Sequence, residues 1–247
     1  MRGKLTNKNN QRQLAQEQLT IGENLSFAAA EAYKLLRTNI QFALPDEQRC
    51  RVVGITSAYS GEGKSTTAVN LSYMLAEAGE RVLLIEADMR LPALTRRLGM
   101  RTSPGLSNVL VGLCNVNEAL QVSPLHEHLS FFSAGDIPPN PSELLGSKAI
   151  GTLMQVLAES FDFVLLDLPP VGEVTDALVA SKLTDGMVVV VRQNYAERRA
   201  VADTMRQLEY ANAKVLGFVM TCSEAQTKGK YKSYKKGYGY GYGAAKG

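Results

Sequence analysis

Short apolar runs alternate with stretches of helical periodicity along most of the chain. Apolar, β-branched runs bounded by turn residues predict strands over 51–56, 81–85, 129–133, 161–167, 187–191 and 215–220. Apolar positions at helical spacing predict helices that begin at 26 and 66, one over 142–159 and one over 197–210. Strands that alternate with helices indicate an α/β fold, a mostly parallel sheet with helices on both faces.

Both ends of the chain break this pattern. Residues 1–20 are polar, and residues 226–247 contain only Lys, Gly, Tyr, Ser, Ala, Gln and Thr. We therefore expect a flexible segment over 1–25, a folded domain over 26–225 and a disordered tail over 226–247. The ends are basic, whereas residues 21–225 hold 17 basic and 23 acidic residues. The whole-chain charge of +3 is therefore no argument for nucleic-acid binding.

Three cysteines are dispersed along the chain, and their spacing fits neither a disulfide framework nor a zinc site. The N-terminus lacks the apolar core of a signal peptide. No apolar run approaches the roughly 18 residues that suggest a membrane span. These features predict a protein of the reducing cytoplasm.

The chemistry begins in the loop after the first predicted strand, AYSGEGKS at 58–65. A strand, a glycine-bearing loop, Lys-Ser and a helix are the context of a phosphate-binding loop, although Ala58 replaces its first glycine. Such a loop directs backbone N–H groups and a helix N-terminus at phosphates, with Lys64 near the β- and γ-phosphates and the Ser65 hydroxyl on Mg²⁺. The expected ATP-binding residues are Ser60, Gly61, Glu62, Gly63, Lys64, Ser65 and Thr66.

Acidic residues follow two further strands. The second strand leads into Glu86-Ala87-Asp88-Met89-Arg90, and the strand over 161–167 ends in Asp167. Four apolar residues followed by an aspartate match a Walker B pattern, whose carboxylate orients magnesium. Ligands of α/β proteins bind at the carboxyl ends of strands, so these acids are candidates for the same nucleotide site.

The tail gathers half of the ten tyrosines into its last 17 residues: Tyr231, Tyr234, Tyr238, Tyr240 and Tyr242. Because the lysines and glycines between them cannot build a core, these aromatic side chains must serve another purpose. A nucleic-acid arm, attraction to a membrane surface and a set of phosphoacceptors are three readings that the tail alone leaves open.

Taken together, the phosphate loop, the acid-x-Asp-x-Arg motif, the Walker B aspartate and the tyrosine cluster resemble the bacterial tyrosine kinases. These are P-loop autokinases associated with capsular and exopolysaccharide synthesis, and the resemblance covers roughly 26–247. Ala58 and the stretch PPNPSELL at 138–145 also agree with that family. The resemblance implies autophosphorylation of the tail in trans, with ATP as substrate and Mg²⁺ as cofactor.

The resemblance also implies roles for the acidic motifs. The family's second motif usually reads Asp-x-Asp, whereas this chain has Glu86 at the first position. The general base that accepts the tyrosine proton is therefore either Glu86 or Asp88. Ser65, Asp88 and Asp167 are the implied magnesium ligands. Lys64 and Arg90 would stabilise charge on the transferred phosphoryl group.

Partners are implied in the same way. A charged stripe, Glu31, Lys34 and Arg37, on the helix over 26–44 resembles the family's Glu-x-x-Arg-x-x-Arg element, which packs subunits into an octamer-like ring. Lys34 keeps the charge but lacks a guanidinium fork, which would weaken that ring. A separate transmembrane activator of the polysaccharide copolymerase type would hold the kinase at the inner face of the membrane, and a phosphotyrosine phosphatase would reverse its action. No nucleic acid is expected as a partner.

Two other functions compete with the kinase. Septum-site and partition ATPases share the fold and use ATP as a switch, but their loop carries an additional lysine where this chain has Tyr59. A catalytically weak scaffold of the polysaccharide machinery is the second alternative, because Glu86 departs from the family's aspartate.

Overall fold

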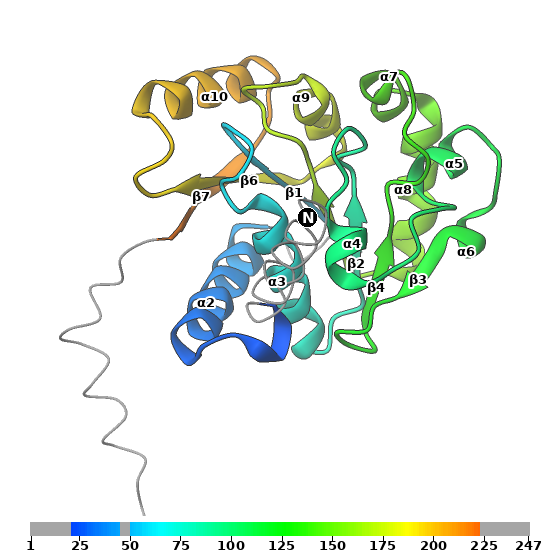
Figure 1. Ribbon diagram of the computed structural model, residues 1–247, viewed down its shortest axis with the longest axis horizontal. Helices are drawn as coiled ribbons and strands as arrows, with labels where there is room; N and C mark the ends of the chain where they lie inside the picture. The colour runs from blue at the N-terminus through cyan, green and yellow to red at the C-terminus, as the bar shows by residue number, and fades with distance from the viewer. Residues whose placement is uncertain (1–20, 45–49, 223–247) are drawn as a thin grey trace, which may run out of the picture.

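A computed structural model describes residues 21–44 and 50–222 of the chain. Within them, one sheet with the strand order β3-β4-β2-β5-β1-β6-β7 lies between two layers of helices (Figure 1). The predicted α/β fold with a mostly parallel sheet is confirmed. Most of the predicted N-terminal segment over 1–25 and the whole predicted tail over 226–247 lie outside the described residues.

All strand pairings are parallel except that of β3 with β4. Every residue of β2 and β5 is buried, since helices cover both sides of the sheet, as continuous apolar runs in parallel sheets require. In chain order the strands are β1 Arg51–Ser57, β2 Val82–Glu86, β3 Leu120–Val122, β4 Leu129–Phe132, β5 Phe163–Asp167, β6 Gly186–Arg192 and β7 Val215–Thr221.

Helices cover the two faces of the sheet with separate apolar clusters. On one face, α2 (Phe27–Ala43) and α3 (Lys64–Glu77) pack on alternate residues of the strands, as Ile55 and Leu84 show. On the other face lie α8 (Lys148–Ser160), α9 (Asp176–Ala180) and α10 (Arg198–Tyr210). The remaining helices are η1 Gly22–Asn24, α4 Leu94–Leu98, α5 Leu106–Leu110, α6 Val116–Ala119, α7 Pro141–Leu145 and η2 Ser181–Leu183.

The predicted helix at 26 is confirmed, and its start has a local cause. Ser26 is the N-cap of α2, and its hydroxyl accepts a hydrogen bond from the backbone N–H of Ala29 at 3.3 Å. A serine in this position satisfies one of the N–H groups that the first turn leaves without a partner.

The prediction of one helix over 142–159 is wrong. Two helices, α7 and α8, occupy this region and are separated by Gly146 and Ser147. Ser147 is extended and caps α8 by accepting a hydrogen bond from the N–H of Ile150 at 3.4 Å. A capping serine after a glycine is a signal for a new helix start. The break lets α7 turn toward the carboxyl ends of the strands.

Candidate active site

The candidate site lies at the carboxyl ends of three adjacent strands. β5 lies between β1 and β2 in the sheet. β1 leads into the phosphate loop, β2 ends at Glu86 and β5 ends at Asp167. Glu86 and Asp167 stand opposite one another in the register of their strands. The topology therefore brings the three predicted motifs to the sheet edge where α/β proteins bind ligands.

Two glycines shape the phosphate loop. Gly61 has φ +81° and Gly63 has φ +94°, a left-handed region that residues with a Cβ rarely adopt. α3 begins directly after Gly63, so Lys64 and Ser65 already belong to the helix, which starts two residues earlier than expected. The loop thus points the N-terminus of a long helix at the space where phosphates would bind.

Glu62 is directed into the protein rather than toward the nucleotide space. Its side chain is fully buried and accepts hydrogen bonds from the N–H of Tyr59 at 2.7 Å and of Arg192 at 3.1 Å. Its backbone oxygen accepts a bond from the Thr221 hydroxyl at 2.7 Å. The carboxylate therefore ties the loop to the ends of β6 and β7, and only the backbone of Glu62 is left for the predicted contact with ATP.

Further contacts fix the loop from outside. The N–H of Ser60 donates to Glu173 at 2.7 Å, and the Ser60 carbonyl accepts from the Tyr195 hydroxyl at 3.1 Å. The Arg192 guanidinium donates to the Gly61 carbonyl at 3.2 Å and lies 5.3 Å from the centre of the Tyr195 ring. These bonds hold the loop in shape before any nucleotide arrives.

Lys64 lies among the predicted carboxylates. Its ammonium is 2.9 Å from Asp88 Oδ2, and both side chains are buried. Burial alone would lower the pKa of Lys64, but the charges of Asp167 and Asp88 outweigh it and raise the pKa. Burial raises the pKa of Asp167 to about 6, against the opposing effect of the Lys64 charge. The structure thus brings Lys64, Asp88 and Asp167 together as the sequence predicts.

The same residues fit a magnesium ion. Asp167 Oδ1 is buried and has no hydrogen-bond partner among the described residues, which suits an oxygen intended for a cation or its water. Asp167 interacts with the nearby Ser65 hydroxyl. The described chain contains no cluster of three or more His, Cys, Asp or Glu residues that could hold a metal alone. Mg²⁺ characteristically combines one or two carboxylates with substrate phosphates, so this sparse set of ligands is appropriate.

Glu86 takes part in a different set of contacts. Its carboxylate is fully buried; Oε1 accepts from the N–H of Leu94 at 2.5 Å and of Thr95 at 3.4 Å, and Oε2 accepts from the Thr95 hydroxyl. Both oxygens thus hold the first turn of α4. Of the two candidates for the general base, Asp88 is the one beside Lys64.

Arg90 is fixed by a residue that the sequence analysis missed. Its Nε and Nη2 lie 2.8 Å and 3.0 Å from the carboxylate of Asp176, which is fully buried at the start of α9. Ser142 of α7 donates to the same carboxylate. The stretch PPNPSELL is thereby connected to the Arg90 motif. No local pattern marks Asp176, because its role depends on partners distant in sequence.

We expect Asp176→Ala to lower the free energy of unfolding by about 1–3 kcal/mol. Removing one member of a buried pair costs more, but Arg90 is 41% exposed and water partly compensates it. Chemical denaturation followed by circular dichroism measures the change.

The matched control is Asp203→Ala, whose carboxylate is 41% exposed and pairs with Arg199 and Arg206 on the surface of α10. Exposed pairs contribute about 0–1 kcal/mol. Equal destabilisation by the two substitutions would contradict the role assigned to Asp176.

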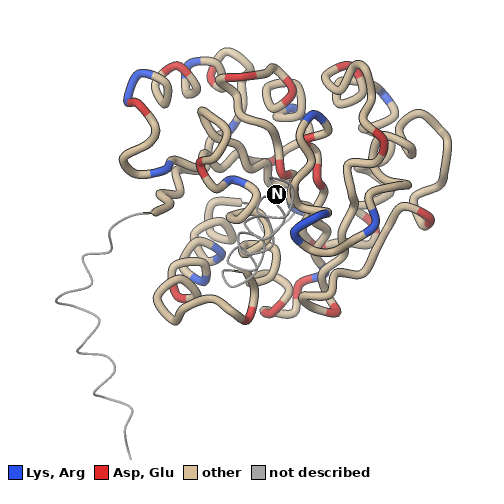
Figure 2. The backbone as a smooth tube through the Cα atoms, in the orientation of Figure 1, with Lys and Arg blue, Asp and Glu red and all other residues tan. Residues whose placement is uncertain are grey.

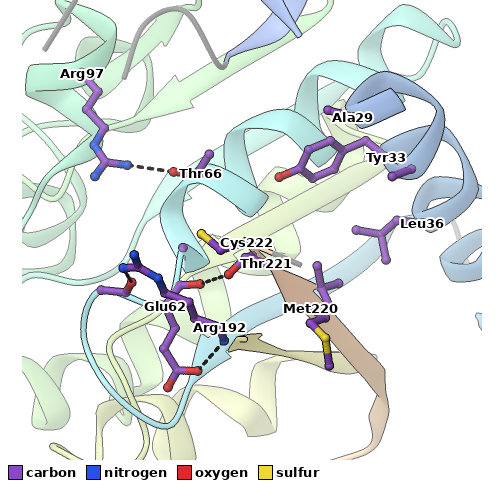
Figure 3. Close-up of a pocket in the computed structure, with 14 residues that line it drawn as sticks. Ala29, Tyr33, Leu36, Glu62, Thr66, Arg97, Arg192, Met220, Thr221 and Cys222 are labelled. Carbon is purple, nitrogen blue, oxygen red and sulfur yellow. Dashed lines mark hydrogen bonds between the residues drawn. The ribbon is translucent and has the colours of Figure 1, made fainter. Parts of the chain in front are cut away.

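A cavity of about 540 Å³ opens beside the phosphate loop (Figure 3). Figure 3 shows its wall formed by α2, by the end of β7 and by the start of α3. Its apolar part includes Tyr33 and Leu36 of α2 and Met220 of β7, whereas Gly63 and Thr66 form the part at the phosphate loop and the start of α3. An apolar chamber next to a phosphate loop has the character of a nucleobase pocket.

The cavity residues outside the loop itself were not predicted from the sequence. Tyr33 has the pattern of an ordinary helix position, Met220 lies near the end of β7, and Cys222 directly follows that strand. They reach the loop only because β7 is an edge strand whose end lies beside α2 and α3. Sequence spacing carries no signal of this.

The charged stripe of α2 has partners within the chain. Lys34 Nζ lies 3.0 Å from Glu31, and the Arg37 guanidinium donates to the Met74 carbonyl near the end of α3 at 2.8 Å. The structure holds one chain, so the ring predicted for Glu31, Lys34 and Arg37 stays a prediction.

Comparison with known proteins identifies the family. A model described as an AAA domain matches residues 50–215. The tyrosine-protein kinase YwqD of Bacillus subtilis is 38% identical over 205 residues, which cover 83% of this chain and 86% of that protein. The chain belongs to the bacterial tyrosine kinases. The tyrosine-protein kinase CpsD of Streptococcus agalactiae is 32% identical over 209 residues, or 83% of this chain and 90% of CpsD.

Solved structures agree with this assignment to the bacterial tyrosine kinases. The chimerical protein CapA2B2 has a TM-score of 0.77 at 34% identity, covering 83% of this chain and 89% of that one. The kinase domain of the Escherichia coli tyrosine kinase Etk has a TM-score of 0.78 at 28% identity, covering 92% and 85%. The septum site-determining protein MinD of Pyrococcus horikoshii, solved with Mg-ADP, has a TM-score of 0.59 at 23% identity and shares the fold.

Kinases of this family occur in chains of different length. The tyrosine-protein kinase ptk of Acinetobacter johnsonii is 34% identical over 207 residues, which are 84% of this chain but 28% of ptk.

In the described part of this chain, no helix has the length and apolar character needed to cross a bilayer. Figure 2 shows Lys and Arg interspersed with Asp and Glu along the described part of the chain.

Proposed function

We propose that this bacterial tyrosine kinase transfers the γ-phosphoryl group of ATP to tyrosines of its own C-terminal cluster, Tyr231, Tyr234, Tyr238, Tyr240 and Tyr242. The observation that carries the proposal is the 2.9 Å ion pair of Lys64 with Asp88 beside Asp167, at the end of a phosphate loop. A phosphate-binding cation and a carboxylate that can accept a proton are thus in contact. The identity of the relatives as tyrosine kinases supports the tail as acceptor.

In the proposed reaction, the phenol oxygen of a tail tyrosine attacks the γ-phosphorus, and the bond from that phosphorus to the ADP oxygen breaks. The phenol proton passes to Asp88, because Asp88 lies beside Lys64 of the phosphate loop, whereas the carboxylate of Glu86 is fully buried against α4. Removal of this proton is useful since the free pKa of tyrosine is about 10. Lys64 stabilises charge on the transferred group. Arg90, which is positioned by Asp176, also stabilises charge on the transferred phosphoryl group.

Magnesium would be held by Ser65 and Asp167, with Asp88 within reach through water. When bound, Mg²⁺ neutralises charge on the β- and γ-phosphate oxygens. The base of ATP would occupy the cavity between α2 and β7, with Ser60, Gly61, Gly63 and Thr66 along its phosphates. Asp167 Oδ1, which is buried and has no hydrogen-bond partner within residues 21–44 and 50–222, supports this arrangement.

We further propose that transfer occurs in trans within a homo-oligomeric ring that uses Glu31, Lys34 and Arg37 of α2. A separate membrane activator would stimulate the kinase at the inner face of the membrane, and a phosphotyrosine phosphatase would reset the tail. The process served would be capsular or exopolysaccharide synthesis or export. The occurrence of relatives both as chains of this length and as units of longer chains is consistent with an activator supplied separately.

Mass spectrometry of the full chain after incubation with Mg-ATP tests the function, with and without the activator's cytoplasmic segment. We expect phosphotyrosine confined to 231–242 and absent from a chain truncated before Lys230. A matched control replaces Tyr210, an exposed tyrosine of α10 outside the cluster, with phenylalanine and leaves the yield unchanged. Hydrolysis to ADP without phosphotyrosine would instead indicate a switch ATPase. Bound nucleotide without turnover would indicate a scaffold.

A further inference from the structure

Glu86 ends β2, and the structure shows what its side chain reaches. The carboxylate binds two successive backbone N–H groups, of Leu94 at 2.5 Å and Thr95 at 3.4 Å, as well as the Thr95 hydroxyl. The Leu94 side chain is buried in the apolar cluster between the sheet and the α2–α3 layer. The first turn of α4 is therefore held by hydrogen bonds from its backbone and from the Thr95 hydroxyl to Glu86, and by packing of the Leu94 side chain.

α4 carries an arginine to the phosphate loop. The Arg97 guanidinium donates to the Thr66 hydroxyl at 3.1 Å, and Arg97 lines the cavity beside the loop together with Gly63 and Thr66 (Figure 3). Its positive charge acts on the Lys64 ammonium, whose pKa it lowers in opposition to the carboxylates. Arg97 thus adds a cation to the binding space, next to Thr66.

The position of Thr66 indicates which part of a nucleotide Arg97 would meet. In a phosphate loop, the lysine reaches the β- and γ-phosphates, while the backbone of the loop cradles the α- and β-phosphates. Thr66 lines the cavity that also contains the apolar residues Tyr33 and Met220, whereas Lys64 and Asp88 are not among its lining residues. The Arg97 guanidinium therefore lies toward the α-phosphate and the nucleoside rather than toward the transferred γ-phosphate.

We propose that Glu86 is a positioning residue that sets nucleotide affinity by holding α4, so that Arg97 binds the α-phosphate side of ATP and ADP. The nature of the nucleotide rests on the proposed function. The contact between Glu86 and α4 depends on the length of the side chain: aspartate, shorter by one bond of about 1.5 Å, would lose the reach to α4. Glu86 acts through Arg97 and takes no proton from tyrosine.

The test measures the Kd of ADP in the presence of Mg²⁺ by calorimetry, using the full chain. Arg97→Met is expected to raise Kd roughly tenfold, since a hydrogen bond to a charged group typically contributes enough for such a change. Arg96→Met is the matched control, because Arg96 is an exposed neighbour on the same short helix, and its Kd should stay within about twofold. ATP should respond to Arg97→Met by the same factor as ADP; a loss confined to ATP would place Arg97 at the γ-phosphate and overturn the assignment.

Two substitutions of Glu86 separate positioning from proton transfer. Gln keeps the length of the side chain and still accepts from the α4 backbone, so Glu86→Gln should raise the Kd of ADP less than Glu86→Asp, which loses the reach. A general base would give the opposite order in turnover, with Asp retaining the carboxylate and ADP affinity unchanged. That result would overturn the proposal.

A double substitution checks that both residues act as one unit. Glu86→Asp combined with Arg97→Met should bind ADP within about twofold of Arg97→Met alone, whereas independent effects would multiply. Multiplicative losses would contradict the proposal. Failure of the wild type to bind ADP would overturn both this inference and the proposed function. Normal ADP binding without phosphotyrosine would overturn the function and leave the role of Glu86 and Arg97 standing.

Discussion

Replacing Lys64 with methionine is expected to reduce tyrosine phosphorylation by on the order of 10³-fold. The ammonium is the buried cation of the site, 2.9 Å from Asp88, and methionine retains its apolar stem without the charge. Negative charge on the transferred phosphoryl group would then lack its principal protein partner. Quantitative detection of phosphotyrosine at saturating Mg-ATP measures the loss.

Two controls are needed to interpret the loss of phosphorylation in Lys64→Met. Lys182→Met removes an exposed lysine of η2 and should leave phosphorylation within twofold of the wild type. Thermal unfolding of the Lys64→Met protein shows whether the fold persists with Asp88 and Asp167 uncompensated. A folded Lys64→Met protein that phosphorylates the tail normally would refute the assigned role of Lys64.

Replacing Asp167 with asparagine is expected to stabilise the nucleotide-free protein while reducing phosphorylation by at least about 100-fold. Burial raises the pKa of this carboxyl from 3.8 to about 6, so above pH 6 the fold bears the cost of a buried charge. Such a shift corresponds to about 2–3 kcal/mol. Asparagine keeps the shape and removes that cost, and it also removes the charge that magnesium requires.

The sign of the effect fixes its pH dependence. Below about pH 4 the carboxyl is protonated in both the folded and the unfolded chain. The wild-type and Asp167→Asn proteins should therefore have similar free energies of unfolding in this range. Between pH 4 and 6 the wild type loses stability as pH rises, and above pH 6 the difference is constant. Denaturant titrations at pH 4.5 and 7.5 test this, with Glu127→Gln as an exposed control. Equal stability of the Asp167→Asn and wild-type proteins at pH 7.5 would refute it.

Much of the fold could be predicted because its causes are local. Apolar runs bounded by turns located six of the strands, and the exception is β3, a three-residue antiparallel strand that is too short to show a pattern. The short helices between β2 and β4 escaped notice for the same reason, since five residues cover less than two helical turns. Gly146 and Ser147 did carry a local signal for the break between α7 and α8.

The candidate site likewise has features with a local sequence signal and features that depend on tertiary packing. That Lys64, Asp88 and Asp167 lie together could be predicted from the sequence, because each lies at or just beyond the end of a strand and a parallel sheet brings strand ends together. The part played by Asp176 could not be predicted, since it depends on how α7 and α9 pack around Arg90. Which acid faces α4 and which faces Lys64 likewise depends on side-chain direction at the end of β2.

The ion pair between Lys64 and Asp88 has a consequence for how the nucleotide binds. The loop does not offer an empty positive site, because a carboxylate of the same chain already neutralises the lysine. An arriving phosphate must exchange with that internal anion, so the gain in free energy is the difference between two ion pairs. Under the proposed function, binding would be weaker than a free cation would allow, and Asp88 returning to Lys64 would assist release of ADP after transfer. The chain would then carry its own competitor for the phosphate, which would favour turnover over tight retention of product.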